Sequence, residues 1–518
     1  MIENKKRYFM IVGVFCIISA LIGGTLAWYT WQSENNTNVS FTVGGVDITF
    51  DAGSDITSSK LRPVSTKEYG VANDYAIEKT ITASSPVTAY LNLYLTLETL
   101  PTGLKHESFI WEIYKDNTLV SKGNFKNNNQ GDKVTIASNQ EITSTTSTYK
   151  LYIWIDGANY SNPETMQNQT FKFVLNADAT DQEPPASLIT LTKLGLTANE
   201  GTPDFNKTAQ ATCEGLEPEE QEYCETTNGI YAAEDDLGTS YYFRGAVENN
   251  YVKFANFYWR IIRINGDGTI RMIYDGTSAH ANGENSIDRE VSGTAFNTNS
   301  NDNTYVGYMY GTPSSSTYED THANTNDSTI KTANDNWYKT NIADAGYSQY
   351  IADAIYCADR QVASVPSMEL TGNGTGTQET GYGFFKRIEI SSEGMPTNVT
   401  PSLKCTQAND KFTVTSSLGN GDLTYPVGLL TIDEANMAGG YIASENYSYY
   451  LYSGQYYWTM SPRDFNYGSS LVWNVYSTGA LNATPVDYSI ALRPVISLKS
   501  DITFSGNGSM SSPFEIVS

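Results

Sequence analysis

Apolar and polar residues alternate along the first third of the chain, and this pattern predicts β-strands. Residues Tyr90–Leu97 alternate strictly, with Leu on one side and Asn, Thr or Tyr on the other. Short alternating strands separated by turn residues are typical of an antiparallel sandwich, which we expect over residues 36–180. The same alternation defines the other strands that we assign to this region: Val39–Val43, Val46–Phe50, Tyr149–Ile155 and Phe171–Leu175.

The chain after residue 213 combines strands with turns rich in Gly and Asn, and with fewer helices. Residues Trp259–Ile264 and Thr269–Tyr274 flank Asn265–Gly268, which predicts a hairpin with its arginines on the outer face. Helices are predicted at Thr329–Tyr350 and at Thr431–Ala438, the second with a capping Thr, an acidic first turn and a Gly stop.

A Pro-rich stretch separates the two regions. Asp181–Ser187 breaks the periodicity, so we place a boundary there and expect residues 181–212 to be a linker. From Ser187 to about Gln210 the alternatives are an extended arm and an extra strand, and a polar spacer between two modules is the simplest account.

The stretch Gln455–Leu498 organises our functional interpretation. Its aromatic residues are interleaved with Asn, Ser and Gly and carry few charges nearby, which favours a recognition surface. A pyranose offers an apolar face that stacks on Trp or Tyr, and hydroxyls that bond to Asn, Asp or Arg. The alternative is that these aromatics fill the core of a β domain. The candidate ligand-binding residues are Tyr457, Trp458, Arg463, Asp464, Asn466, Tyr467, Trp473 and Asn474.

The N-terminus has the pattern of an export leader. Met1–Arg7 is basic, and Tyr8–Ser33 carries no charge. We expect residues 1–31 to be a signal peptide or a retained membrane anchor. The small residues of Gly23–Ala27 favour cleavage after Ala27.

The charge balance restricts the partners. The chain has 32 basic and 57 acidic residues, a net charge of −25. Such a field repels nucleic acid and anionic membrane surfaces. We therefore expect no nucleic-acid role, and membrane contact only through the N-terminal segment.

Four cysteines lie outside the leader: Cys213, Cys224, Cys357 and Cys405. An even number in an exported region predicts two disulfides, for which three pairings exist. We favour Cys213–Cys224 and Cys357–Cys405 because each closes a modest loop. Free thiols are the alternative.

Histidine is scarce, which excludes a His-rich metal site. His106 is expected to be solvated, and a Ser-His-Asp triad would need His280 or His322, neither of which lies near a nucleophile elbow. Calcium is possible at the oxygen-rich segments Asn265–Gly268 and Asn301–Asn303, but both are better explained as turns. We expect no cofactor.

The N-terminal half resembles a known family. The block GGTLAWYT followed by Phe41–Asp47, and the segment Tyr149–Ala177, resemble the leader and β-sandwich of camelysin and TasA-type biofilm-fibre proteins. The resemblance implies a sandwich that supports surface fibres and self-assembles, in some members by strand exchange.

The C-terminal half resembles a module of secreted gut Firmicutes proteins, and more distantly the C-type-lectin-like and formylglycine-generating-enzyme-like fold. The matching blocks are FYWRIIRINGDGTIRMIYDG, NDNWYKTNI, YPVGLLTIDEANMAGG, YYWTMSP and ALRPVISL, within residues 225–518. The resemblance implies an irregular α+β domain over residues 213–518, with a ligand surface on its last strands and a structural role for Arg493. The enzyme branch needs paired cysteines beside the substrate, and none lies near Trp458–Arg493, so no catalysis is implied.

The sequence thus predicts a mainly β, multidomain, exported protein. Our hypothesis is a non-catalytic, adhesin-like protein that recognises an extracellular glycan or protein ligand. The alternatives are a structural subunit of a fibre and an enzyme on the same C-terminal fold.

Overall fold

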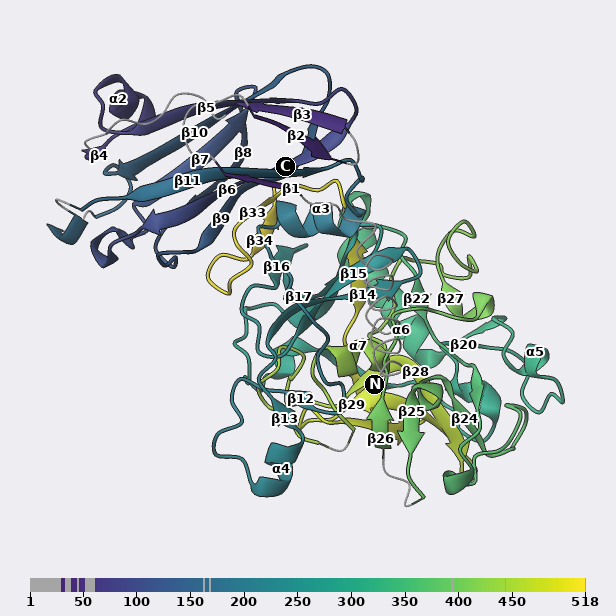
Figure 1. Cartoon of the computed structure of the whole chain (residues 1–518). Helices are drawn as coiled ribbons and strands as arrows, with labels where there is room; N and C mark the ends of the chain where they lie inside the picture. Colours follow the sequence, from purple (N-terminus) through teal and green to yellow (C-terminus); the bar gives the residue numbers. More distant parts are fainter. Residues whose placement is uncertain are drawn as a thin grey trace, which may run out of the picture. The chain divides into compact units, whose positions relative to one another are not determined.

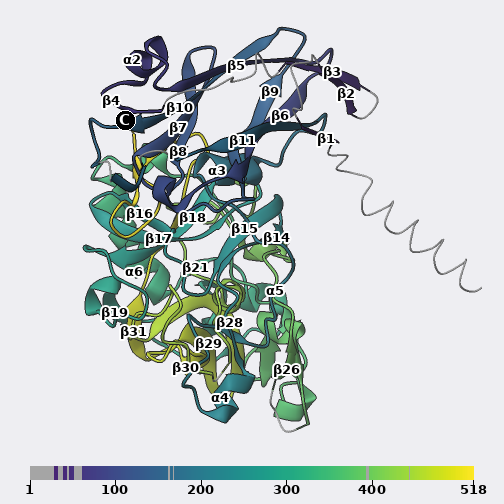
Figure 2. The same ribbon diagram turned by 60° about the vertical axis from the view of Figure 1, so that its left-hand side comes forward.

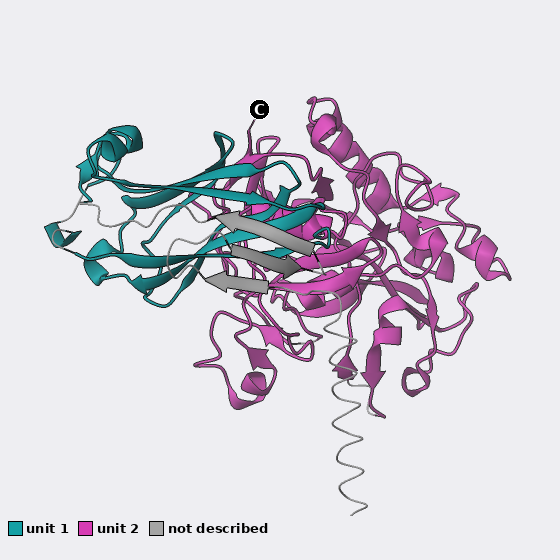
Figure 3. Cartoon of the chain, turned by 45° about the horizontal axis from the view of Figure 1, so that its top comes forward, with its two compact units in different colours: residues 1–184 teal, residues 185–518 magenta. Residues whose placement is uncertain are grey.

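The computed structural model describes residues 29–32, 39–43, 46–51, 61–161, 164–166, 169–392, 396–442 and 444–517. The chain divides into two compact units, residues 1–184 and 185–518 (Figure 3). Residues 1–28, which hold most of the predicted leader, lie outside the described part. Among the described residues, none of the helices has the length and apolar character needed to span a bilayer.

Unit 1 contains the predicted antiparallel strands in two sheets (Figure 1). The order in one sheet is β1-β11-β6-β9, and in the other β2-β3-β5-β10-β7-β8, with β4 beside β10. The bounds are β1 (Tyr29–Gln32), β2 (Val39–Val43), β3 (Val46–Asp51), β4 (Pro63–Val64), α2 (Lys67–Ala72), β5 (Ile77–Ser84), β6 (Ala89–Thr99), η1 (Thr102–Leu104), β7 (Phe109–Lys115), β8 (Thr118–Asn124), β9 (Lys133–Ile142), β10 (Ser147–Asp156), η2 (Glu164–Met166) and β11 (Lys172–Thr180).

The core of unit 1 follows from strand periodicity. Leu91, Leu93, Leu95 and Leu97 project from one face of β6 and are fully buried. They pack with inward residues of the other sheet, such as Ile153. Alternation places successive side chains on opposite faces, so the sequence pattern alone locates this core.

The segment predicted as a linker belongs to unit 2 from Pro185 onward, which corrects the expectation of a polar spacer. Helix α3 (Ala186–Lys193) begins one residue later, and Leu191 and Leu194 join the core of unit 2. The hydroxyl of Thr190 donates to the carbonyl of Gly268 at 2.8 Å. The apolar residues of this segment occur in short clusters separated by polar residues. They show no clear helical or strand periodicity, so the sequence does not predict that the helix packs on unit 2.

The predicted hairpin is present in unit 2 as β17 (Phe257–Ile264) and β18 (Ile270–Gly276), but its arginines do not face solvent. Arg260, Arg263 and Arg271 are all buried. Both strands lie inside an eight-stranded sheet of the described chain, and consecutive residues of both are buried, so both of their faces are covered. The other strands of this sheet are β14 (Gly229–Asp235), β15 (Gly238–Arg244), β16 (Tyr251–Phe254), β32 (Val495–Leu498), β33 (Phe504–Ser505) and β34 (Phe514–Ile516).

A second sheet of unit 2 is built on the C-terminal stretch. Strand β28 (Tyr457–Asn466) pairs with β29 (Ser469–Val475), and β29 pairs with β30 (Leu481–Pro485) (Figure 2). Its remaining strands are β19 (Val291–Ala295), β23 (Val362–Ala363), β24 (Thr380–Tyr382) and β31 (Ser489–Leu492). Four two-stranded sheets complete the described part of unit 2: β12 (Thr208–Ala209) with β13 (Cys224–Glu225), β20 (Met309–Tyr310) with β21 (Asn326–Asp327), β22 (Tyr356–Cys357) with β27 (Lys411–Phe412), and β25 (Ile388–Ile390) with β26 (Pro396–Val399).

Both predicted helices form, although the first is shorter than expected. Helix α6 (Thr329–Tyr338) continues as a π-helical turn, η5 (Lys339–Ala343). Helix α7 (Ile432–Met437) has the full capping box of Thr431 with Glu434. The short helices are α4 (Pro218–Glu222), α5 (Tyr318–Thr321), η3 (Ile287–Arg289), η4 (Asn303–Val306), η6 (Ser348–Tyr350), η7 (Pro366–Met368), η8 (Gly383–Arg387) and η9 (Ala408–Asp410).

Candidate functional site

The three aromatic rings expected to form a ligand platform lie in the core, which corrects that prediction. Tyr457 and Trp458 are 0% exposed and Trp473 is 2% exposed. The indole of Trp458 donates to the carbonyl of Thr294 at 2.9 Å and packs on Phe296. These rings therefore stabilise the unit and cannot stack on an external ligand.

Two polar residues of the expected site are buried as well. Asp464 and Asn474 are both 0% exposed. The amide of Asn474 donates to Thr484 at 2.7 Å across β29 and β30. The Asn474 amide group is thus used for a contact inside the sheet, while the Oδ1 atoms of Asn474 and Asp464 are buried without a hydrogen-bond partner among the described residues. Arg493 is buried as expected for a structural residue, and it donates to the carbonyls of Tyr274 and Leu451.

Tyr467 is the member of the expected site that does face solvent. It is 90% exposed and lies in the two-residue turn between β28 and β29. Tyr467 and Gly468 have φ of +48° and +75°, the combination that a type I′ hairpin turn requires. Asn or Gly normally fills the first position, because a bulky residue is strained there. The turn therefore holds a large ring in solvent at a conformational cost.

A second exposed tyrosine lies at the same end of the sheet. Tyr488 is 61% exposed and follows β30, whose Pro485 pairs with Leu471 of β29. Ser300 joins the two edges: its carbonyl accepts from Ser470 N at 2.6 Å. Its hydroxyl also donates to Asp487 at 3.3 Å. We name this surface the Tyr467 tip, and its members are Ser300, Tyr467, Gly468, Ser469, Asp487 and Tyr488.

The ring of Tyr467 makes no stabilising contact with the described residues. No aromatic pair or side-chain hydrogen bond of the described chain includes it, and only its backbone N–H is engaged, with Glu379 at 3.3 Å. The Tyr-Gly pair between two alternating segments is the sequence feature that indicates a turn at this position. Tyr488 lay in the stretch singled out by sequence but was not among the candidate ligand residues.

A charged pair lies beneath the tip on β28. Arg463 donates to the carboxylate of Asp464, and its guanidinium lies 5.2 Å from the ring centres of Phe385 and Trp473. Burial raises the pKa of Asp464 to about 6, against the attraction of Arg463. Arg463 and Asn466 are only partly buried, so they are the two remaining expected site residues that border solvent.

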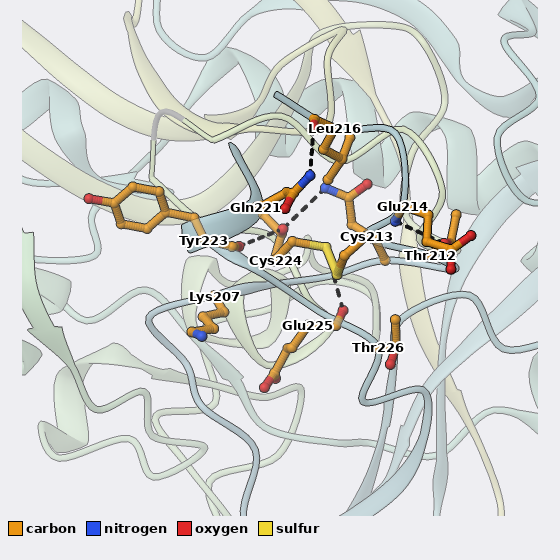
Figure 4. The surroundings of a disulfide bond; sticks show 12 residues. Lys207, Thr212, Cys213, Glu214, Leu216, Gln221, Tyr223, Cys224, Glu225 and Thr226 are labelled. Atoms are coloured by element: carbon orange, nitrogen blue, oxygen red, sulfur yellow. Dashed lines mark hydrogen bonds between the residues drawn. A yellow bond between two sulfur atoms is a disulfide. The ribbon is translucent and has the colours of Figure 1, made fainter. Parts of the chain in front are cut away.

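The predicted disulfides are both present. Cys213–Cys224 closes an exposed loop, and Cys357–Cys405 joins segments 48 residues apart. Figure 4 shows the first bond beside Gln221, whose amide donates to the carbonyl of Leu216 at 2.8 Å. Disulfides form and persist in oxidising compartments.

One cluster has the residue types of a hydrolase triad but not its proton arrangement. The Nε2 atom of His280 lies 3.3 Å from Ser278 Oγ, and its Nδ1 atom lies 2.8 Å from Glu284. The serine hydroxyl donates instead to Asp288, which also lies 3.0 Å from Nε2. Burial opposes ionisation of Asp288, but hydrogen bonds from His280, Thr277 and Ser278 outweigh it and hold its pKa well below the usual range. The cluster therefore clamps the loop of residues 277–288.

The second histidine of a possible triad is also structural. His322 is buried, and burial lowers its pKa to about 3. Its Nε2 atom lies 2.9 Å from the carbonyl of Gly374, and its ring packs on Tyr318. A neutral, enclosed imidazole of this kind holds loops together.

The oxygen-rich segments considered for calcium are hydrogen-bonded turns. Asp267 accepts from the backbone and hydroxyl of Thr269, and Asp302 accepts from the backbone of Thr304 and Ser314. Within the part of the chain that the structure describes, no group of three or more His, Cys, Asp or Glu residues is placed to hold a metal ion.

Comparisons with known proteins add little. The chain matches no protein-family model and no curated protein sequence. A solved structure of the tandem CBM51 modules of Sp3GH98, the family 98 glycoside hydrolase from Streptococcus pneumoniae SP3-BS71, matches 53% of this chain and 73% of that chain. The identity is 10% and the TM-score is 0.13, which is too low to bear on fold or function.

Proposed function

We propose that this chain is an exported, non-catalytic binding protein that recognises a glycan through the Tyr467 tip of unit 2. The observation that carries this proposal is the solvent-exposed ring of Tyr467 at a positive φ. Strained backbone is enriched at binding and active sites, so the positive φ of a bulky exposed residue supports a functional role for this ring. A tyrosine ring offers an apolar face and a polar edge at low entropic cost, and Ser and Gly around it add adaptable hydrogen bonding.

Several features support export. Two disulfides belong to oxidising compartments, and the basic and apolar pattern of residues 1–31 is that of a leader. The net charge of −25 favours solubility over adsorption to anionic surfaces. In this proposal unit 1 is a camelysin-like sandwich that supports unit 2, and unit 2 is C-type-lectin-like.

The test is binding of the mature chain to an immobilised array of bacterial and host glycans. Tyr467→Ala should weaken binding at least about tenfold, the loss of one stacking residue. Tyr69→Ala is the matched control, because Tyr69 is 54% exposed but lies on α2 of unit 1.

Two outcomes would overturn the proposal. One is glycan binding that is unchanged in Tyr467→Ala while the melting temperature is also unchanged. The other is a wild-type chain that binds no glycan on the array. Retained binding in Tyr69→Ala, together with loss in Tyr467→Ala, supports it.

A further inference from the structure

Lys331 is a buried nucleophile enclosed by two carboxylates. Its side chain is 1% exposed and projects from the first turn of α6. The Nζ atom lies 2.8 Å from Asp335 Oδ2 and 3.1 Å from Asp327 Oδ1. Asp335 is 11% exposed and Asp327 is 41% exposed, so the reactive atoms lie at the inner end of a cluster that opens toward solvent.

As an ion pair this cluster is incompletely satisfied. An ammonium has three N–H donors, and the described residues offer Nζ two carboxylate partners. The Oδ1 atom of Asp335 is buried without a hydrogen-bond partner. Buried charges with unmet partners are costly, because neither water nor the protein solvates them.

The geometry points to an intramolecular isopeptide bond between Nζ of Lys331 and Cγ of Asp335. The reaction joins one ammonium and one carboxylate and releases one water, so it needs no oxidant, reductant or other co-reactant. First, the ammonium transfers a proton to Asp335, which gives a neutral amine and a carboxylic acid. The amine then attacks Cγ, the N–C bond forms, and the C–OH bond breaks.

Asp327 carries the remaining proton. Its carboxylate is close enough to accept a proton from Nζ as the N–C bond forms. It then returns this proton to the departing hydroxyl, which leaves as water, and Asp327 is restored. Burial raises the pKa of Asp335 above its usual range, which favours the protonated acid that this step consumes.

The helix accommodates the product. Residues four apart lie on one face of a helix, with their Cβ atoms within reach of each other. The amide product has one N–H, which donates a hydrogen bond to Asp327. Neither Lys331 nor Asp335 is charged after the bond has formed. The bond therefore removes the unmet donor and the charge burial together.

An exposed pair on the same segment provides an internal control. Lys339 and Asp344 lie 2.7 Å apart, but their side chains are 53% and 59% exposed. Water solvates both charges there, so the amine stays protonated and unreactive. This pair should remain an ordinary ion pair.

The test is mass spectrometry of the full chain after denaturation, reduction and trypsin. We expect the segment of residues 290–339 to survive as one peptide, uncut after Lys331 and lighter by about 18 Da, the mass of one water. Fragmentation should give no backbone ions between residues 331 and 335. Cleavage after Lys339 should be normal.

Variants separate the bond from an unrelated loss of water. Lys331→Arg keeps a buried cation but cannot form the amide. Trypsin also cuts after arginine, so it should release residues 290–331 and 332–339 as two peptides of full mass. Asp327→Asn removes the proton carrier and should leave trypsin able to cut after Lys331. A wild-type chain that is cut after Lys331 and has its full mass overturns the proposal, as does a water loss that persists in Lys331→Arg.

Discussion

The indole nitrogen of Trp458 donates to the carbonyl of Thr294 at 2.9 Å, which joins two segments 164 residues apart in the core of unit 2. Trp458→Ala should therefore lower the free energy of unfolding by about 3–5 kcal/mol, through a cavity and an unpaired carbonyl. Denaturant unfolding measures this change. Tyr467→Ala should change it by less than about 0.5 kcal/mol, and equal effects would contradict the placement of the two rings.

Tyr467→Asn should stabilise the protein while it weakens ligand binding. Asn tolerates the left-handed conformation of the turn, whereas Tyr is strained there. We expect the free energy of unfolding to rise by about 0.5–1 kcal/mol. A loss of stability in this variant would show that the ring makes contacts that support the fold.

Asp275 is a single buried carboxylate shared by two arginines. Its Oδ1 atom accepts from Arg289 at 2.9 Å and from Arg493 at 2.8 Å, and all three side chains are fully buried. Asp275→Asn leaves two buried cations uncompensated and should cost about 3–5 kcal/mol of unfolding free energy. Asp344→Asn, which breaks an exposed pair, should produce no measurable change in the same denaturation assay.

The two disulfides should differ in their sensitivity to reduction. Each bond joins one partly exposed and one buried cysteine, but most residues of the loop closed by Cys213–Cys224 are exposed, and Cys405 is more buried than Cys224. Mild dithiol treatment followed by alkylation should label Cys213 and Cys224 first, as measured by peptide mass spectrometry. Prior labelling of Cys357 would mean that its surroundings open more readily than the surface loop.

Stability should fall as pH rises through the range where Glu290 ionises. Burial raises the pKa of Glu290 to about 7, against the attraction of Arg493. The folded state then binds more protons than the unfolded state, so this contribution favours folding at low pH and is lost between about pH 4.5 and 7. Asp464, with a pKa of about 6, acts with the same sign.

Glu290→Gln tests this sign. The free energy of unfolding of the variant should decline much less with pH than that of the wild type. At pH 8 it should exceed the wild-type value by about 1 kcal/mol, a value reduced for the partial exposure of Glu290. Unfolding curves at several pH values measure it. A decline as steep as in the wild type would assign the effect to other groups.

The sequence predicted the features that depend on local patterns. The strand around Leu93, the helix cap at Thr431 and both disulfide pairings are confirmed. It failed where distant segments decide burial. The alternation around Trp458 does not reveal that β24 and β31 flank β28, and Asn474 looks like a surface residue until its partner Thr484 is known. Of the four aromatic candidates, Tyr467 is the exposed one, and its position in the turn between β28 and β29 was not predicted.

Arginines are unusually prominent among the largest fully buried side chains of unit 2: Arg244, Arg260, Arg271, Arg289, Arg360 and Arg493. Each guanidinium needs acceptors from segments that are remote in sequence. Arg244 alone takes the carbonyls of Asp204, Lys207, Asn436 and Met437. In a partly folded unit these cations would be buried without their acceptors. This cost raises the free energy of folding intermediates, so we expect the unit to fold in one cooperative step. Each arginine thus couples the folding of several segments. Lysine could not replace it, because its ammonium group lacks the planar, five-donor geometry of the guanidinium group.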